Sequence, residues 1–512
     1  MKYIVPVLAI YGLMSCTKLD EKLNNALTPE QATASNTADG LLKSAYYSMN
    51  PALIDQAGWM SLTEHTSDEY CGPTRATNWD DNGVWRVLHQ HAYDANHTYI
   101  TATFEGLLVM QYNASNVLNF SPSASQAAEA RFLRAYSMYL TVSGWGQVPF
   151  RDYNVPLSAV PPVYRDTAAL DFIISELTAI IPTLPAHSAV PSTQANQDAA
   201  KFLLMKCYLN RGTYENRKSP TFDPADMQQV ITLADELTGY TLTPNYYDNF
   251  SPISLTASKE NIFGFVSTPA SDAAGGNNVR SRWYCGLNYN NNPGGWNGFC
   301  TLSDFYDKFE NTDIRKSYAY PGLAATSGLN AGFLIGQQKD KNGNPINVSS
   351  SLASGPPLVF TAAISPTLQE TDPATLDVTG IRVIKFVPDY QNTNDPSNEL
   401  PFFRYADVLL MKAEAAFRTG DDGTALTILN QIKTARGASN IATVTDSEIL
   451  DERGRELYTE MWRREDQIRF GTFLQPNQAK PAASDPKYLL FPIPANDLAA
   501  NPNLVQNDGF GN

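Results

Sequence analysis

The clearest pattern of apolar and polar positions lies in residues 127–150, where apolar side chains recur at three- and four-residue steps. Phe132 and Tyr136 begin this series, which places its members on one face of a helix. Gly144 and Gly146, in a Gly–Trp–Gly turn, end the pattern, and Pro149 prevents its continuation. The stretch therefore predicts a long scaffold helix followed by an extended segment.

The same period predicts further helices, which are joined by short turns. Gly212 is expected to end one of them, and Thr445 with Glu448 forms a capping box that opens another. Two helices in a unit of about 34 residues match the tetratricopeptide period, although that consensus is absent. The sequence thus predicts a mainly α fold with a tetratricopeptide-like helix-pair scaffold. The expected helices are 38–49, 98–120, 167–181, 196–211, 224–237, 403–419, 424–435 and 445–470.

Two stretches lack a helical period. Residues 50–94 contain Trp59, Trp79 and Trp85, and residues 241–398 are rich in Gly, Asn, Pro and Ser. The longer one is expected to form a loop-rich, ligand-binding subdomain with short β elements at 262–266 and 383–387. Long irregular regions in a globular chain are usually functional.

We expect one domain over residues 38–512. Its helical scaffold would comprise about 38–240 and 400–475, with the subdomain at about 241–398 folded against it.

The net charge and the aromatic content restrict the classes of ligand that the protein is expected to bind. The net charge of −15 argues against nucleic acid, anionic polymers and an electrostatic hold on an anionic membrane. A neutral ligand is the natural complement. The chain has 26 Tyr, 23 Phe and 7 Trp, which suits either a ligand with flat apolar faces or simply an aromatic core.

The N-terminus predicts the compartment. Residues 3–13 form an apolar run that is too short to span a bilayer, so residues 1–15 are interpreted as a signal peptide. The run ends in L-M-S-C, which looks like a bacterial lipobox and makes Cys16 the expected site of lipidation. An ordinary secretory signal with a chance cysteine is the alternative. Residues 16–37 would then be a tether, and the acidic pair Asp20–Glu21 resembles an export tag for surface lipoproteins.

Several stretches also match one family. E-A-R-F-L-R-A in the 127–150 helix, S-K-E-N-I-F at 258–263, R-Y-A-D-V-L-L at 404–410, the E-R-x-x-E-L block at 452–457 and F-P-I-P at 491–494 resemble the SusD/RagB family. The departures are small: Gly454 and Phe470 replace a common Arg and Trp. The resemblance implies an outer-membrane, surface-exposed lipoprotein that captures nutrients. It also implies a partner, a SusC-like TonB-dependent transporter, and a role in glycan import.

Candidate ligand-binding residues follow from the irregular stretches and from this resemblance. A Trp ring can cover the apolar face of a sugar while Asp, Asn and Arg bind its hydroxyls. The clusters at 68–85 and 283–300 supply both kinds of group. The predicted ligand-binding residues are Asp68, Arg75, Trp79, Trp85, Trp283 and Trp296, and the resemblance adds Cys300, Arg382 and Tyr405.

Other functions have weaker support. His65, His89, His91 and His97 lie close in sequence but form no metal-binding motif, and neither a metal nor a cofactor is expected. Asp68–Glu69 and Asp80–Asp81 are adjacent pairs whose side chains point apart, so no catalytic residues are predicted. A peptide-binding lid of the RagB type remains the alternative to glycan binding. A pairing of Cys285 with Cys300 is left open.

The charged residues in the family-like stretches have a structural interpretation. Their spacing at i, i+3 and i+4 on helices predicts ion pairs between helices rather than ligand contacts. They are Arg131, Arg134, Arg404, Asp407, Glu414, Arg453, Glu456, Arg463 and Asp466.

Overall fold

The computed structural model describes residues 37–268, 279–348, 355–373 and 375–511. The predicted signal peptide, Cys16 and the tether up to residue 36 lie outside these residues. Within the described ranges, no helix combines the length and the apolar character that crossing a membrane requires.

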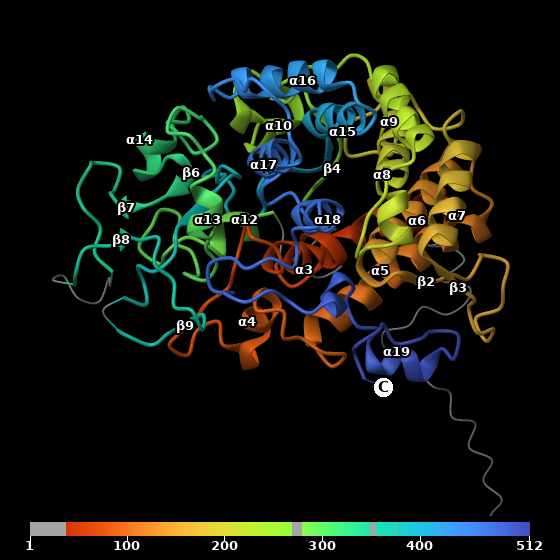
Figure 1. Cartoon of the computed structure of the whole chain (residues 1–512), viewed down its shortest axis with the longest axis horizontal. Helices are drawn as coiled ribbons and strands as arrows, with labels where there is room; N and C mark the ends of the chain where they lie inside the picture. The colour runs from red at the N-terminus through yellow and green to blue at the C-terminus, as the bar shows by residue number, and fades with distance from the viewer. Residues whose placement is uncertain (1–36, 269–278, 349–354, 374, 512) are drawn as a thin grey trace, which may run out of the picture.

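Helices form the scaffold on one side of the molecule (Figure 1). Helix α5 packs on α6, α7 on both α6 and α8, and α8 on α9, while α15 packs on α9 and α16. The scaffold thus consists of neighbouring helix pairs, as predicted. Its helices are α2 (Ala38–Tyr47), α3 (Trp59–His65), α4 (Val84–His89), α5 (Thr98–Val117), α6 (Ala124–Trp145), α7 (Asp166–Ile180), α8 (Gln197–Glu215), α9 (Pro224–Glu236), α15 (Tyr405–Arg418), α16 (Asp422–Ala435), α17 (Asp446–Leu457), α18 (Arg463–Arg469) and α19 (Ala495–Ala500).

The loop-rich part contains short elements; those labelled α14, β6, β7 and β8 lie on the opposite side in Figure 1, whereas α10 and β4 lie beside the scaffold helices α15 and α16. Strand β6 pairs antiparallel with β10 and β5, and β4 pairs antiparallel with β11, which leads directly into α15. Its elements are α10 (Ser254–Ala257), α12 (Ser281–Tyr284), α13 (Ser303–Tyr306), α14 (Leu323–Ser327), β4 (Asn261–Val266), β5 (Ser317–Tyr318), β6 (Ala331–Leu334), β7 (Gly336–Gln337), β8 (Val359–Phe360), β9 (Gln369–Glu370), β10 (Arg382–Ile384) and β11 (Glu399–Arg404). Elsewhere β1 (Thr74–Arg75) pairs with β9, and β2 (Gln147–Pro149) pairs with β3 (Val163–Arg165).

Helix α6 confirms the helix predicted from residues 127–150. Ser123 and Gln126 form a capping box at its start, and Gly146 ends it in the left-handed conformation with φ of 69°. Gly144, which was also expected to end the helix, lies within it. From Ala128 to Trp145 nearly every side chain is buried, so the helix is surrounded rather than half-exposed. Its predicted aromatic face packs on β4 and β11: the Phe132 and Phe263 rings lie 5.1 Å apart.

The prediction that residues 50–94 are irregular was partly wrong. Trp59 opens α3 and Trp85 lies on α4, and both side chains are buried. These helices have only seven and six residues, which is too short for the helical period to show in the sequence.

The predicted end of α8 at Gly212 was also wrong, because the helix continues to Glu215. The glycine instead allows a close approach: a Cβ atom there would lie 2.0 Å from the Thr221 carbonyl oxygen. Two smaller corrections concern boundaries. Phe403 lies in strand β11 rather than in a helix, and the strand expected over 383–387 covers only Arg382–Ile384.

The single helix predicted over 445–470 is two helices, α17 and α18. Thr459 and Met461 between them have positive φ values of 57° and 72°. The break lets the Thr459 amide donate to Glu69 at 3.1 Å and the Met461 amide donate to Glu64 at 2.7 Å. Two buried carboxylates thereby gain partners, which an unbroken helix could not provide.

The structure contains the predicted ion pairs between helices, such as Arg453 of α17 with Asp407 of α15 at 2.8 Å, and it adds buried ion pairs that join the scaffold to the loop-rich part. Glu456 of α17 accepts hydrogen bonds from Arg404 at 3.0 Å, from Arg436 at 2.9 Å and from Arg315 at 3.0 Å. Glu260, next to β4, accepts from Arg404 at 2.6 Å. Burial alone would raise the pKa of Glu456, but the three guanidinium groups hold it well below its ordinary value.

We expect Glu456→Gln to lower the free energy of unfolding by about 3–5 kcal/mol, because three buried guanidinium groups would lose their shared carboxylate. Urea-induced unfolding, followed by tryptophan fluorescence, measures the change. The matched control is Glu236→Gln, which removes a surface ion pair with Lys201 where the Glu236 side chain is 50% exposed. The control should cost less than about 1 kcal/mol. Equal stability of the two variants would contradict the role given to Glu456.

Candidate functional site

Three segments far apart in sequence meet: residues 74–85 and, within the loop-rich part, residues 283–300 and 376–382. Arg75 holds them together with a side chain that is 1% exposed. Its guanidinium donates to the Gly298 carbonyl at 3.2 Å and to the Thr379 carbonyl at 2.9 Å. Because the Arg75 guanidinium is bonded inside the protein, to carbonyls of the other two segments, the residue holds the three segments in place.

Four aromatic side chains gather where these segments meet, and we call Trp79, Tyr284, Tyr289 and Trp296 the aromatic platform. The Trp79 and Trp296 rings lie 6.2 Å apart, and the Tyr284 and Trp296 rings 5.7 Å apart. The Trp79 indole donates to the Trp296 carbonyl at 2.9 Å. Tyr289 is 48% exposed and the other three are half-buried, so each keeps part of its surface open.

The backbone under the platform has no room for a side chain. A Cβ atom on Gly298 would lie 2.3 Å from the Trp79 ring. Trp79 itself adopts a positive φ of 59° and directly follows the tight turn that the Arg75–Asn78 bridge closes. The Trp79 ring can therefore cover the 283–300 segment because residue 298 is glycine.

A buried aromatic floor supports the platform and contains Trp85, Phe299, Tyr70 and His65. The Trp79 ring lies 4.6 Å from Phe299 and 5.7 Å from Trp85. His65 lies 4.3 Å from Phe299, and neither of its ring nitrogens has a hydrogen-bond partner. Burial lowers the pKa of His65 to about 3, so its imidazole is neutral at ordinary pH.

Polar groups border the platform. The Asn78 amide donates to the Tyr289 hydroxyl at 3.2 Å and is exposed. The Asn297 amide donates to Asp377 at 2.6 Å, and Arg382 donates to Asn297 at 3.0 Å. Burial raises the pKa of Asp377, against the lowering effect of Arg75 and Arg382. The arrangement offers amide and carboxylate groups at the edge of open aromatic faces.

Several predicted ligand contacts are corrected by their burial. Trp85 is 1% exposed, and Trp283, Cys300 and Arg382 are 0% exposed. None of these four can touch a ligand at the surface of this structure, and Arg75 is equally enclosed. Trp85 and Arg75 support the platform from below.

Two predicted residues serve elsewhere. Asp68 accepts two hydrogen bonds from Arg463, at 2.6 Å and 2.8 Å, which makes it part of the buried ion pairs. Tyr405 lies on α15, where its ring stacks on Tyr240 at 5.7 Å. Of the predicted residues, Trp79 and Trp296 lie close together and are both partly exposed.

Four members of the site, Asn78, Tyr284, Tyr289 and Asp377, are absent from the predicted ligand-binding residues. Tyr289 lies inside an asparagine-rich run, N-Y-N-N-N, and such a solvated run with one aromatic residue was an available signal. Asp377 had no comparable signal, because its place beside Asn297 depends on a contact across 80 positions of sequence.

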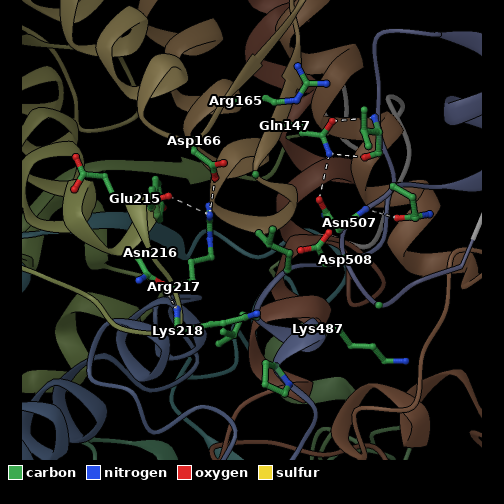
Figure 2. A pocket seen from close by; sticks show the side chains of 18 of the residues that line it. Gln147, Arg165, Asp166, Glu215, Asn216, Arg217, Lys218, Lys487, Asn507 and Asp508 are labelled. Carbon is green, nitrogen blue, oxygen red and sulfur yellow. Dashed lines mark hydrogen bonds and ion pairs between the residues drawn. The ribbon is translucent and has the colours of Figure 1, made fainter.

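A cavity of about 690 Å³ lies elsewhere, between β2, the end of α8 and the C-terminal segment. Figure 2 shows Arg217 pointing toward Asp166, with which it forms an ion pair at 2.6 Å, and Gln147 bonded to Asn507 at 3.2 Å. Another cavity, of about 740 Å³, is lined by Tyr46, Glu129 and Phe265 among others. Neither contains a predicted site residue, and in the first Arg217 and Asp166 already pair with each other.

The fold and the site define a class: a helical scaffold that carries an aromatic platform on a loop-rich face. Known proteins share this fold. A model of the SusD family matches residues 365–510. The starch-binding protein SusD of Bacteroides thetaiotaomicron is 24% identical over 438 residues, which is 79% of this chain and 77% of that protein.

Solved structures share the architecture. A SusD superfamily protein from Parabacteroides distasonis gives a TM-score of 0.69 at 20% identity, covering 95% of this chain and 100% of that chain. Surface glycan-binding protein A from Bacteroides thetaiotaomicron, in complex with laminarihexaose, gives 0.66 at 18% identity, covering 92% and 98%. The resemblance to the SusD/RagB family and the mainly α fold class, both predicted from the sequence, are confirmed.

We expect the buried His65 to make the protein sensitive to mild acid. The imidazole stays neutral when folded but takes up a proton below about pH 6.5 when unfolded. Its contribution is therefore fully present above pH 6.5 and is lost as the pH falls toward 3. His65→Phe should reduce the pH dependence of the free energy of unfolding by about 1 kcal/mol per pH unit between pH 6.5 and 5.

Urea unfolding at several pH values measures this slope. Phe299→Leu is the control, because it disturbs the same aromatic floor but keeps the imidazole, and its slope should match that of the unaltered protein. A slope unchanged by His65→Phe would mean that His65 does not carry the effect.

Proposed function

We propose that this protein binds oligosaccharides or polysaccharides on the aromatic platform. One observation supports this proposal most strongly. Four aromatic side chains are partly exposed beside the Asn78 and Asp377 side chains: Trp79, Tyr284, Tyr289 and Trp296. The C–H face of a sugar ring fits an aromatic ring, and its hydroxyls take hydrogen bonds from amides and carboxylates. The named relatives that bind starch or laminarihexaose support a neutral glucan as the first ligand to test.

The proposed role is capture without chemistry. The Asp377 carboxylate already accepts a hydrogen bond from Asn297, and Asp68 is held by Arg463. Both carboxylates thus have structural partners rather than the free, paired arrangement that glycoside hydrolysis uses. We expect bound glycan to be released uncut.

We further propose that the protein is anchored at the outer membrane through Cys16 and passes its ligand to a SusC-like TonB-dependent transporter. The lipobox-like L-M-S-C and the family resemblance support this placement. Lipid attached to Cys16 would anchor the chain, because each buried CH₂ group contributes about 0.8 kcal/mol.

We expect Tyr289→Ala to weaken glycan binding about tenfold, because the most exposed ring of the platform would be lost. Calorimetry of the full-length protein with laminarin and with soluble starch measures affinity, and chromatography of the recovered glycan tests for cleavage. Tyr112→Ala is a matched control: Tyr112 on α5 is also 48% exposed but lies on the scaffold.

The outcomes separate the candidate functions. Binding that is lost with Tyr289→Ala and kept with Tyr112→Ala supports the platform. If neither glucan binds but an unstructured peptide mixture does, the RagB-type peptide lid replaces this proposal. Shortened glycan products would show an enzyme instead.

A further inference from the structure

Cys71 and Cys300 form a closely matched pair although 229 positions separate them in the sequence. Their backbones form an antiparallel bridge in which each amide donates to the other's carbonyl, at 2.9 Å and 3.0 Å. Their sulfur atoms lie 3.6 Å apart, and both side chains are 0% exposed. Neither of these two cysteines forms a disulfide bond in this structure.

The backbone geometry suits a covalent link. Directly opposed residues in a hydrogen-bonded antiparallel pair have Cα atoms about 5.5 Å apart, within the range of about 4.4–6.8 Å that disulfides span. Small rotations of the two side chains would close the remaining distance between the sulfurs. Cys285 contacts the same segment differently, through its carbonyl, which accepts from the Gly298 and Phe299 amides at 2.8 Å. The pairing with Cys285 that the sequence left open is thus the less favourable one for Cys300.

The surroundings also favour reaction at Cys300. The hydrogen bond with Cys71, together with the guanidinium groups of Arg75 and Arg382, lowers the pKa of the Cys300 thiol to about 7, against the effect of burial. Thiolates, rather than thiols, attack disulfides. Gly380 faces the pair closely, since a Cβ atom there would lie 2.4 Å from the Cys300 sulfur. The chain therefore encloses the two sulfurs together.

We propose that Cys71 and Cys300 form a disulfide bond in the mature protein. The oxidant would be a disulfide, either on a protein oxidase or in a small molecule such as oxidised glutathione. The Cys300 thiolate attacks one sulfur of the oxidant, which gives a mixed disulfide and releases the oxidant's other sulfur as a thiolate. Cys71 loses its proton and attacks the Cys300 sulfur, which expels the second oxidant thiolate. Two cysteine thiols are oxidised, one oxidant disulfide is reduced to two thiols, and the protons end on those thiols.

The bond would tie together two of the segments that carry the aromatic platform. Cys71 precedes the turn that holds Trp79, and Cys300 follows Trp296. A link at this point would limit the separation of the two rings, and a preorganised site binds with a smaller entropic cost. This consequence depends on the proposed glycan binding, whereas the bond itself does not.

Peptide mapping of the full-length protein tests the bond directly. The protein is equilibrated with oxidised glutathione during refolding, alkylated under denaturing conditions without reductant, and digested with trypsin. Cys71 falls in the peptide 44–75, and Cys285 and Cys300 share the peptide 283–308. Chymotrypsin, which cleaves after Phe299, then separates Cys285 from Cys300. We expect a linked peptide that contains Cys71 and Cys300, with Cys285 and Cys207 alkylated.

Two variants make the result decisive. Cys285→Ser should keep the linked peptide, whereas Cys300→Ser should abolish it. In the unaltered protein, reduction should lower the melting midpoint by about 2–5 °C, and the Cys285→Ser variant should show the same difference. Cys300→Ser should melt at one temperature in both redox states. Alkylation of both Cys71 and Cys300 after oxidation, or a link from either to Cys285, would overturn the proposal.

Glycan affinity supplies a separate readout. If the bond pins the platform, reduction should weaken binding several-fold in the unaltered protein and leave Cys300→Ser unchanged. A linked peptide with no glycan binding in either redox state would keep the disulfide and reject the proposed function. Glycan binding without a linked peptide would support the proposed function and reject the disulfide.

Discussion

One buried carboxylate, that of Glu456, connects most of the architecture. Arg404 ends strand β11, Arg436 directly follows helix α16 and Arg315 lies in the loop-rich part, and all three donate to Glu456 where water is excluded. A charge in such a place is costly unless its partners are in position. The scaffold and the loop-rich part therefore have to meet in one register.

Buried polar side chains also hold the aromatic platform in place. Its loops carry few regular hydrogen-bond ladders, so buried side chains hold them instead. Arg75 donates to the carbonyls of two other segments, and Gly298 leaves room for the Trp79 ring. The platform rings can stay open to a ligand because buried polar side chains, rather than the rings themselves, hold the loops in place.

Local patterns predicted the long elements well and the short ones poorly. Helix α6 was predictable from its period and its Gly146 cap, whereas α3 and α4 are too short to show one. The break between α17 and α18 follows from contacts with Glu64 and Glu69, which lie nearly 400 positions away in the sequence. A repeat of helical spacing cannot report such a distant requirement.

The sequence by itself determined the helix-pair scaffold, the family resemblance, the structural role of the charged residues and the two stretches that contain the candidate site. Tertiary structure alone decided which aromatic residues face outward. Trp79 and Trp296 remain open while Trp85 and Trp283 are buried, although all four look alike in the sequence. The physical reason is that exposure is a property of packing between distant segments, and residue type and local spacing carry no information about which side of a loop those segments will cover.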